Sequence, residues 1–337
     1  MTRKTVVLFG TLFLLLTVFQ TSARQGAVEG LRMCFNALVP SLLPFMLLCN
    51  AIVQLSGNIS TPPIAKIARH FRLSSNEMTG FLLSLIGGYP SGAAALANTA
   101  SADNDKRKAD LAAYFVHPGP GFCIGTVGGV LYGSPLLGVI LYLCEIAAAF
   151  LILFLSRHTR RSANESESRV LCPPLSAVFQ AACAKTGLQL LSVCTVVTFF
   201  SAILGSLRQI TPSQLHPIYA FFEVSAGVQS SKNLYFNALL LGFGGLCVMA
   251  QVQSFFKAKI CFWRYLLIRL SAGALTALLL KGVLWLFPVR YRVAALRYIP
   301  AFSPVQNTVA LTVLVVFFLL SISLEKNGGN LREDMLY

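Results

Sequence analysis

Four blocks of almost unbroken apolar sequence constrain this chain more than any other feature. They cover residues 5–19, 135–156, 265–287 and 306–324. A helix of about 20 apolar residues crosses the roughly 30 Å hydrocarbon layer of a bilayer. Only 12% of the 337 residues are charged, where about 25% is usual for a soluble protein. Strand-like alternation is scarce, which disfavours a β-barrel. The sequence predicts an all-α integral membrane protein with about eight transmembrane helices, some of them broken or re-entrant.

The excess of positive charge lies beside the apolar blocks. Twenty-seven lysines and arginines against twelve acidic residues give a net charge of +15. Clusters such as 157–161 and 290–297 are typical of loops that face anionic headgroups. No recognised nucleic-acid-binding motif accompanies them. We therefore expect the lipid bilayer of the cell membrane as the partner of a multi-pass protein, and no nucleic acid; a homo-oligomer is left open.

Motifs for catalysis or metal binding are absent from the sequence. The nine cysteines form no C-x-x-C pair and no zinc-type grouping with histidine, and most are expected to fill space between helices. No H-E-x-x-H, Walker, dinucleotide or G-x-S-x-G motif occurs. Ser91 and His117 could form a nucleophile and base, a pairing that we attribute to chance. We expect no enzyme activity, no metal and no cofactor.

The order of segments suggests two related halves. Residues 1–24 are expected to form an uncleaved transmembrane helix, although the basic start and apolar run also resemble a signal peptide. Residues 25–156 and 175–290 each contain a long apolar segment, a short interrupted one and a glycine-rich one, in that order. Residues 157–174 form a polar linker, and 291–337 supply a last transmembrane helix and a polar tail. Paired interruptions of this kind predict an internal repeat, inverted or not, with a binding site near the bilayer midplane.

Two further segments carry backbone expectations. Pro40 and Pro44 interrupt the apolar segment 31–56, which predicts a kinked or re-entrant helix. Glycines recur every four residues from Gly121 to Gly133. On an α-helix this spacing predicts one bare face for close packing against a neighbour. Residues 118–120 (PGP) just before it leave a loop as the alternative, and we expect a broken entry followed by a close-packed helix.

The sharpest candidate for a site is the interruption Gly88-Tyr89-Pro90-Ser91-Gly92. A helix broken inside lipid must satisfy its freed backbone groups through protein, water or ligand. A half-helix starting near Ser91 would direct its N–H groups at the break, and Asn98 lies two turns further along. The alternative is a tight turn between two short helices.

The other candidates lie at later interruptions. His117 could relay protons or cap an interfacial turn. Glu223 is an ionisable residue in an apolar run, just before Ser225-Ala226-Gly227. Gln251 could offer its amide to a solute or lie at interfacial depth. The predicted solute-binding residues are Gly88, Tyr89, Pro90, Ser91, Gly92, Asn98, His117, Glu223, Ser225, Gly227, Gly244, Gly245 and Gln251.

Five short pieces carry a family resemblance over residues 25–290. They are 39–45 (VPSLLPF), 88–93 (GYPSGA), 222–227 (FEVSAG), 242–245 (GFGG) and 251–254 (QVQS). In this order and spacing the chain resembles the YlbJ-type sporulation integral membrane proteins, which carry nucleoside-recognition (Gate) domains. One departure is that Ala94 follows Ala93, where the family pattern continues Gly-Ala-Lys. The missing basic group argues against an anionic ligand there.

The resemblance implies a multi-pass protein of spore-forming bacteria that helps to build the spore. The Gate domain implies a pore or gate, and a nucleoside-like or other small polar solute. It supplies no catalytic residues. We therefore expect a transporter-like or gate-like protein that binds or moves a small polar solute during sporulation. The alternative is a non-transporting structural or assembly factor of the spore envelope.

Overall fold

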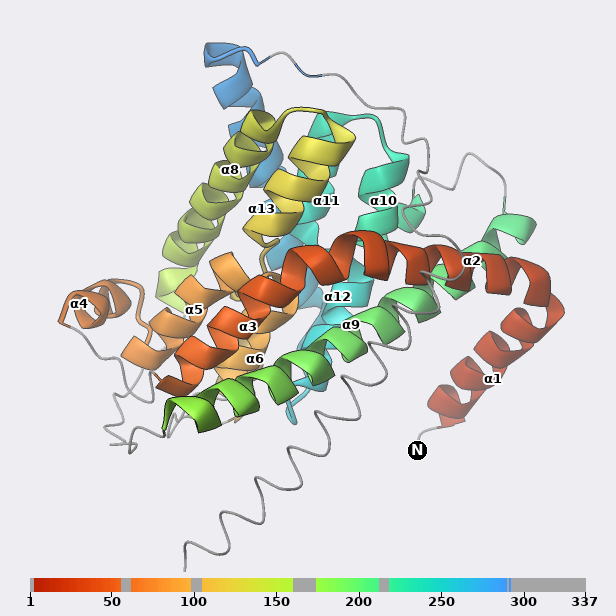
Figure 1. Ribbon diagram of the computed structural model, residues 1–337, viewed down its shortest axis with the longest axis horizontal. Coiled ribbons are helices and arrows are strands. Elements are labelled where there is room, and N and C mark those ends of the chain that lie inside the picture. Colours follow the sequence, from red (N-terminus) through yellow and green to blue (C-terminus); the bar gives the residue numbers. More distant parts are fainter. Residues whose placement is uncertain are drawn as a thin grey trace, which may run out of the picture.

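The computed structural model describes residues 3–55, 62–97, 105–159, 174–211, 218–289 and 291. These residues form helices joined by turns and contain no β-strand, so the all-α prediction is confirmed for them. Figure 1 shows two long helices lying side by side across several helices that run in another direction. The predicted last span at 306–324 and nearly all of the predicted linker lie outside the described residues.

Five helical stretches in the described ranges are long and apolar enough to cross a membrane, against about eight expected. Their bounds are Gln20–Gln54, Pro135–His158, Leu175–Ile210, Leu234–Ser254 and Phe262–Leu286. In the last of these, Trp263 and Trp285 are both exposed near opposite ends. Their 22-residue separation corresponds to about 33 Å of helix. Tryptophans gather at the two membrane–water interfaces, so this spacing fits a bilayer.

The N-terminal part of the chain consists of a short first helix and a long second helical stretch. Helix α1 (Arg3–Val18) is followed by α2 (Gln20–Met33), a π-helical segment η1 (Cys34–Leu38) and α3 (Val39–Leu55). The chain does not turn back at Pro40 or Pro44, so the re-entrant alternative for this segment is wrong. The π-helical turn immediately before Pro40 changes the hydrogen-bond register where a donor is missing, which allows the helix to continue.

Helix α9 (Leu175–Ile210) runs antiparallel to α2 and α3, as Figure 1 shows. Small residues allow the close approach: Gly26 lies against the Ser201 backbone, and Gly205 lies against the Ser22 carbonyl. Further along, the Asn50 side-chain amide donates to Thr186 Oγ1 at 2.9 Å and to Gln189 Oε1 at 2.8 Å. This pair therefore combines close backbone packing at one end with buried hydrogen bonds at the other.

The predicted interruption at Gly88 separates α5 (Ser75–Gly87) from α6 (Tyr89–Ala97). Gly88 has φ 84° and ψ 179°, a backbone conformation that only glycine adopts without strain. Beyond the break, Gly92 packs directly against Ser84 and folds α6 back onto α5. The interruption is therefore a sharp reversal between two short buried helices.

A second interruption lies at Gly244. It separates α11 (Leu234–Phe243) from α12 (Gly245–Ser254), and Gly244 has the left-handed φ of 84° and ψ of −16°. Helix α10 (Val224–Ser230) precedes this pair, and α13 (Phe262–Leu286) follows it. Helices α11 and α13 meet where Gly242 lies against Gly273. The internal repeat is not confirmed and stays a prediction.

The remaining described segments lie around these pairs. They are α4 (Pro62–His70), α7 (Asp105–Leu111), η2 (Ala112–Tyr114), η3 (Gly121–Leu131), α8 (Pro135–Leu155) and η4 (Ser156–Thr159). The prediction of one bare glycine face is wrong, because the glycines of η3 do not meet one neighbouring helix: Gly121 lies against the Ser41 carbonyl of α3, whereas Gly129 has only Ile124 of its own segment nearby. Gly128 packs against Gly138 of α8, whereas Gly125 has no neighbour within 4 Å of where a side chain would start.

Candidate functional site

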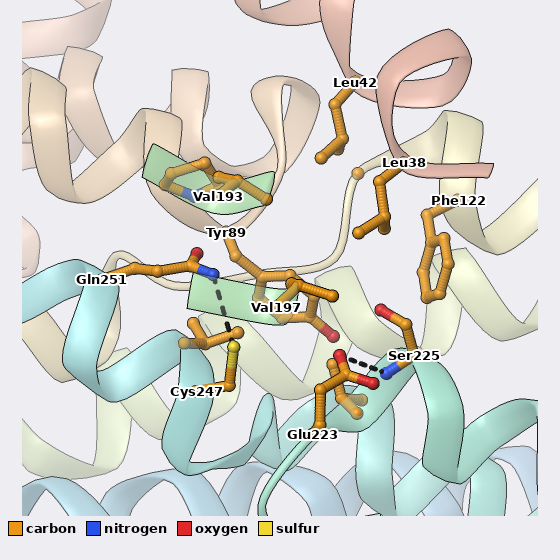
Figure 2. Close-up of a pocket in the computed structure, with 14 residues that line it drawn as sticks. Leu38, Leu42, Tyr89, Phe122, Val193, Val197, Glu223, Ser225, Cys247 and Gln251 are labelled. Carbon is orange, nitrogen blue, oxygen red and sulfur yellow. Dashed lines mark hydrogen bonds between the residues drawn. The ribbon is translucent and has the colours of Figure 1, made fainter. Parts of the chain in front are cut away.

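A small cavity lies where the interrupted segments meet the long helices (Figure 2). Its volume is about 30 Å³. Its walls come from segments η1, α3, α6, η3, α9, α10 and α12, together with Gly119 just before η3 and Glu223 just before α10. The lining residues are Leu38, Leu42, Tyr89, Pro90, Gly119, Phe122, Val193, Val197, Glu223, Val224, Ser225, Cys247, Val248 and Gln251. The walls are mainly apolar, and Glu223, Ser225 and Gln251 are among the few polar residues in them.

Glu223 is the one acidic residue in this lining. It is 1% exposed and caps the start of α10. Its Oε1 accepts the Ser225 N–H at 3.0 Å, and its Oε2 accepts the Ala226 N–H at 2.5 Å. Burial raises the pKa of this carboxyl above its ordinary value, and hydrogen bonds from the Ala226 and Ser225 N–H groups and from the Ser225 hydroxyl offset part of that rise. Glu223 takes part in none of the ion pairs found among the described residues, which include Glu77–Arg107, Glu29–Arg208 and Asp110–Arg264.

Gln251 brings an amide to the same cavity from α12. Its Nε2 donates to Cys247 Sγ, one turn earlier, at 3.5 Å. The side chain is buried, and its Oε1 accepts no hydrogen bond from the part of the chain that the structure describes. In Figure 2 the amide lies at the rim of the lining, between Val193 and Cys247. A buried amide oxygen without a donor is available to water or a ligand.

Tyr89 joins the two interruptions. Its ring lines the cavity, while its hydroxyl donates to the Leu241 carbonyl at 2.8 Å. Buried Arg269 of α13 donates through Nε to the Phe243 carbonyl at 3.2 Å and through Nη2 to the Gly242 carbonyl. Ending α11 at Gly244 frees these three carbonyls, and an unpaired carbonyl is costly in lipid. Tyr89 and Arg269, which lie outside α11 and α12, therefore supply hydrogen bonds to the carbonyls left free at the second interruption.

Arg269 was missed in the sequence analysis, although the signal was present. It stands inside the apolar block 265–287. An ionisable side chain within such a block generally faces a partner or a cavity. This rule made Glu223 a candidate site residue, and the same rule applied to every apolar run would also have made Arg269 one.

The structure brings part of the predicted site together. Five of the predicted residues line the cavity: Tyr89, Pro90, Glu223, Ser225 and Gln251. Three other predicted residues are glycines whose backbone packs against the cavity-lining residues or their neighbours. Gly88 lies against Gly119, Gly244 against the Tyr89 ring, and Gly245 against the backbone of Phe222 and Val224.

Other predicted residues have local roles outside the cavity lining. Ser91 Oγ donates to the Gly87 carbonyl at 2.8 Å and so belongs to the turn between α5 and α6. Gly92 packs against Ser84, and Gly227 packs against Ala220. Asn98 lies outside the described residues.

His117 also lies away from the cavity lining. Its Nε2 donates to the Tyr114 carbonyl at 2.9 Å, and its ring packs edge-on to Phe81 at 5.6 Å. Burial lowers the pKa of His117 to about 3, so the ring is neutral at physiological pH. These contacts favour the turn-capping interpretation. They also give Ser91 and His117 separate hydrogen-bond partners.

Comparison of the chain with protein-family models, with curated proteins and with solved structures gives no match. The chemistry of the cavity is therefore argued from its own residues. One carboxylate, one hydroxyl and one amide within apolar walls can bind a small polar or charged species by hydrogen bonds or coordination.

Proposed function

We propose that this chain is a gate-like, multi-pass membrane protein that binds or moves a small polar solute. One observation carries the proposal. Tyr89 and Pro90 from the first interruption, Glu223 and Ser225 from the start of α10, and Gln251 beyond the second interruption line a single cavity. Polar groups at interrupted helices are a recurrent way to build a solute site inside a membrane. A role in sporulation rests on the resemblance alone and is part of the proposal.

The size of the cavity supports a gate in its closed form. A volume of about 30 Å³ is far below the roughly 150 Å³ that admits benzene. A solute the size of a nucleoside therefore enters only if the lining segments separate. Gly88 and Gly244 stand at the joints between the short helices, where backbone rotation is least restricted.

A non-transporting structural or assembly factor of the spore envelope is the second candidate. The observation that favours it is the mutual satisfaction of the breaks, since Tyr89 and Arg269 cap the carbonyls of Leu241, Gly242 and Phe243. A scaffold needs only this internal pairing. The free amide oxygen of Gln251 and the cavity beside it are what a scaffold does not explain.

Ligand-dependent thermal unfolding of the detergent-purified protein tests the proposal. The panel contains nucleosides, nucleobases and dipicolinate. A ligand that binds only the folded state raises the stability by mass action, by about 2.7 kcal/mol at a hundredfold excess over its dissociation constant. We expect at least one compound to raise the melting temperature, and a flat panel would move the weight to the scaffold.

Two variants of α9 locate the binding. Val193→Leu adds one methylene to the cavity wall and should weaken a positive response. Thr195→Leu makes a similar addition on the exposed face of the same helix and should leave the response unchanged. Equal responses in both variants would show that the ligand binds elsewhere.

A further inference from the structure

One end of the molecule brings α4, α7 and the last turn of α8 together. His70 of α4 stacks on Phe154 of α8, with ring centroids 5.5 Å apart. Arg107 of α7 donates to the Arg72 carbonyl, two residues beyond α4, at 3.2 Å. Figure 1 shows α4 at the outer edge of the molecule, beside α5. We refer to this end as the α4 end.

The start of α13 belongs to the α4 end as well. Arg264 forms an ion pair with Asp110 of α7, with their charged atoms 3.4 Å apart. The opposite end is marked by Tyr132, just before α8, and by Tyr291, beyond α13, whose ring centroids are 5.6 Å apart. Helices α8 and α13 therefore run antiparallel and separate the two ends.

Basic residues are concentrated at the α4 end. Residues 62–74 carry three lysines or arginines and no acidic residue, and residues 255–264 carry three more and no acidic residue. At the opposite end, segments 131–134 and 231–233 carry one charged residue, Lys232. The three arginines of the cluster at 290–297 lie outside the described residues. An excess of lysine and arginine is typical of the cytoplasmic side of a membrane protein.

Helix α4 itself is amphipathic. Ile64 packs against the hydrophobic core and Ala68, one turn later, is fully buried. Lys66 and Arg69 lie on the opposite face, are exposed, and form no ion pair among the described residues. Ile67 lies at the edge of the apolar face and is 45% exposed. A helix with a basic face and an exposed apolar edge is suited to the plane of a membrane interface.

The level of α4 along the spans matches that plane. The α8 span ends at His158, one turn beyond the Phe154 ring on which His70 stacks. At the same end, Trp263 of α13 is 70% exposed. Tryptophans gather at the level of the headgroups. Helix α4 therefore lies where the spans meet the headgroup layer.

We propose that α4 is an interfacial anchor that binds anionic phospholipid headgroups of the cytoplasmic leaflet through Lys66 and Arg69, while Ile67 enters the acyl-chain boundary. The inference goes beyond the proposed function and does not depend on a solute. Charge complementarity selects the lipid, because the cytoplasmic leaflet is the anionic one. Ile67 selects a lipid over a free phosphate, since acyl chains remove an apolar side chain from water and phosphate does not.

Quenching by labelled lipids tests the anchor in the full-length protein in nanodiscs. A fluorophore is attached to Ile67→Cys or to Arg69→Cys, each without other cysteines, and the lipid carries a spin label on its acyl chain. We expect stronger quenching for Ile67→Cys than for Arg69→Cys. For Ile67→Cys, labelled phosphatidylglycerol should quench more than labelled phosphatidylcholine, by about twofold or more. Equal quenching in the two variants, or by the two lipids, overturns the proposal.

Two matched charge variants assign the lipid preference. In the Ile67→Cys protein, Lys66→Gln together with Arg69→Gln should remove the preference for phosphatidylglycerol. Lys232→Gln together with Arg208→Gln removes the same two charges from other exposed positions and should keep it. An unchanged preference in the first pair contradicts the assignment to α4.

Thiol labelling in a bacterial host tests the leaflet. Lys66→Cys and Lys232→Cys, each without other cysteines, are treated with a membrane-impermeant maleimide. We expect Lys232→Cys to react in intact cells and Lys66→Cys to react only after the cells are opened. The reverse pattern would place α4 on the outer face and overturn the assignment to the cytoplasmic leaflet.

Discussion

Glu77 shows how a buried acid is satisfied elsewhere in this protein. Its side chain completes a capping box with Ser74 at the start of α5, where the Ser74 N–H donates to Oε2 at 2.9 Å. Arg107 donates to both carboxylate oxygens, at 2.9 and 3.0 Å. Glu77 is fully buried, as Glu223 is, and it differs from Glu223 in having a cation, Arg107, beside it.

Arg107→Ala should therefore be strongly destabilising. Removing one partner of a buried pair leaves an uncompensated charge and costs about 3–5 kcal/mol. Arg208→Ala breaks the exposed Glu29–Arg208 pair, whose charged atoms are 3.8 Å apart, and should cost about 0–1 kcal/mol. The melting temperatures of the two variants make the comparison. Similar small losses in both would show that the Glu77–Arg107 contact is not formed.

The burial of His117 predicts that the stability of the folded protein depends on pH in the acidic range. Its pKa is about 3 in the folded protein and 6.5 as the ordinary value, so between these values the unfolded chain binds a proton that the folded chain does not. Stability therefore falls as the pH drops below about 6.5, by up to roughly 1.4 kcal/mol per pH unit from this group. His117→Gln keeps a donor for the Tyr114 carbonyl without this titration. The variant should lose less melting temperature than the wild type between pH 7.5 and 5.0, and an equal loss would contradict the burial of His117.

Individual residues of the cavity were partly predictable from the sequence. Glu223 and Gln251 stand out because polar groups within apolar runs are costly and need partners. Tyr89 stands out because it sits in a costly interruption. The apolar half of the lining, such as Leu38 and Val193, gives no such signal, because an apolar residue in an apolar helix looks the same whether it faces lipid or a cavity.

At the scale of elements, the packing of α2 on α9 depends on small residues. A side chain added at Gly26 would collide with the Ser201 backbone, which cannot move aside easily. Gly26→Leu should thus lower stability by about 1–3 kcal/mol or more through overpacking. Gly10→Leu in α1 is the matched control, because nothing lies within 4 Å of that position. Equal melting temperatures in the two variants would show that α2 and α9 are not in close contact.

The structure gives Gly92 a different role from the one that the sequence suggests. In the sequence it belongs to the interruption, which suggests that Gly92→Leu would abolish function by blocking a site. In the structure it packs against Ser84 and the Phe115 carbonyl, outside the cavity lining. The substitution should act by separating α5 from α6, and so a loss of function in that variant would carry no information about the solute site.

The elements themselves were predictable to different degrees. The interruption at Gly88 was predicted from its glycines within an apolar run, since a positive φ is open to little else. The predicted break at Ser225-Ala226-Gly227 is wrong, because these residues form the first turn of α10, and the second interruption lies at Gly244 instead. The continuous helix through Pro40 and the π-helix at 121–131 were not predicted, because both depend on a shifted hydrogen-bond register that residue spacing does not reveal. Contacts between distant segments, such as Gly242 with Gly273, also lie beyond what one sequence shows.

At the scale of the whole molecule, the cavity lies at a junction of elements. The long pair of α3 and α9 forms one side, and the short helices α6, α10 and α12 form the other (Figure 1). Separating these two groups opens the cavity without unfolding any helix. A gate-like protein should sample this separation, whereas a scaffold should stay closed.

Single-cysteine accessibility in the membrane tests this separation most directly. Cys247 lines the cavity and Cys144 of α8 is buried outside it, so two variants each retain one of these cysteines and no other. A small, charged methanethiosulfonate reagent is applied to membranes from either side, and full reaction in SDS confirms that each thiol is intact. We predict that Cys247 reacts in folded protein while Cys144 does not. Protection of both thiols would contradict a water-accessible gate and leave the structural role as the better account.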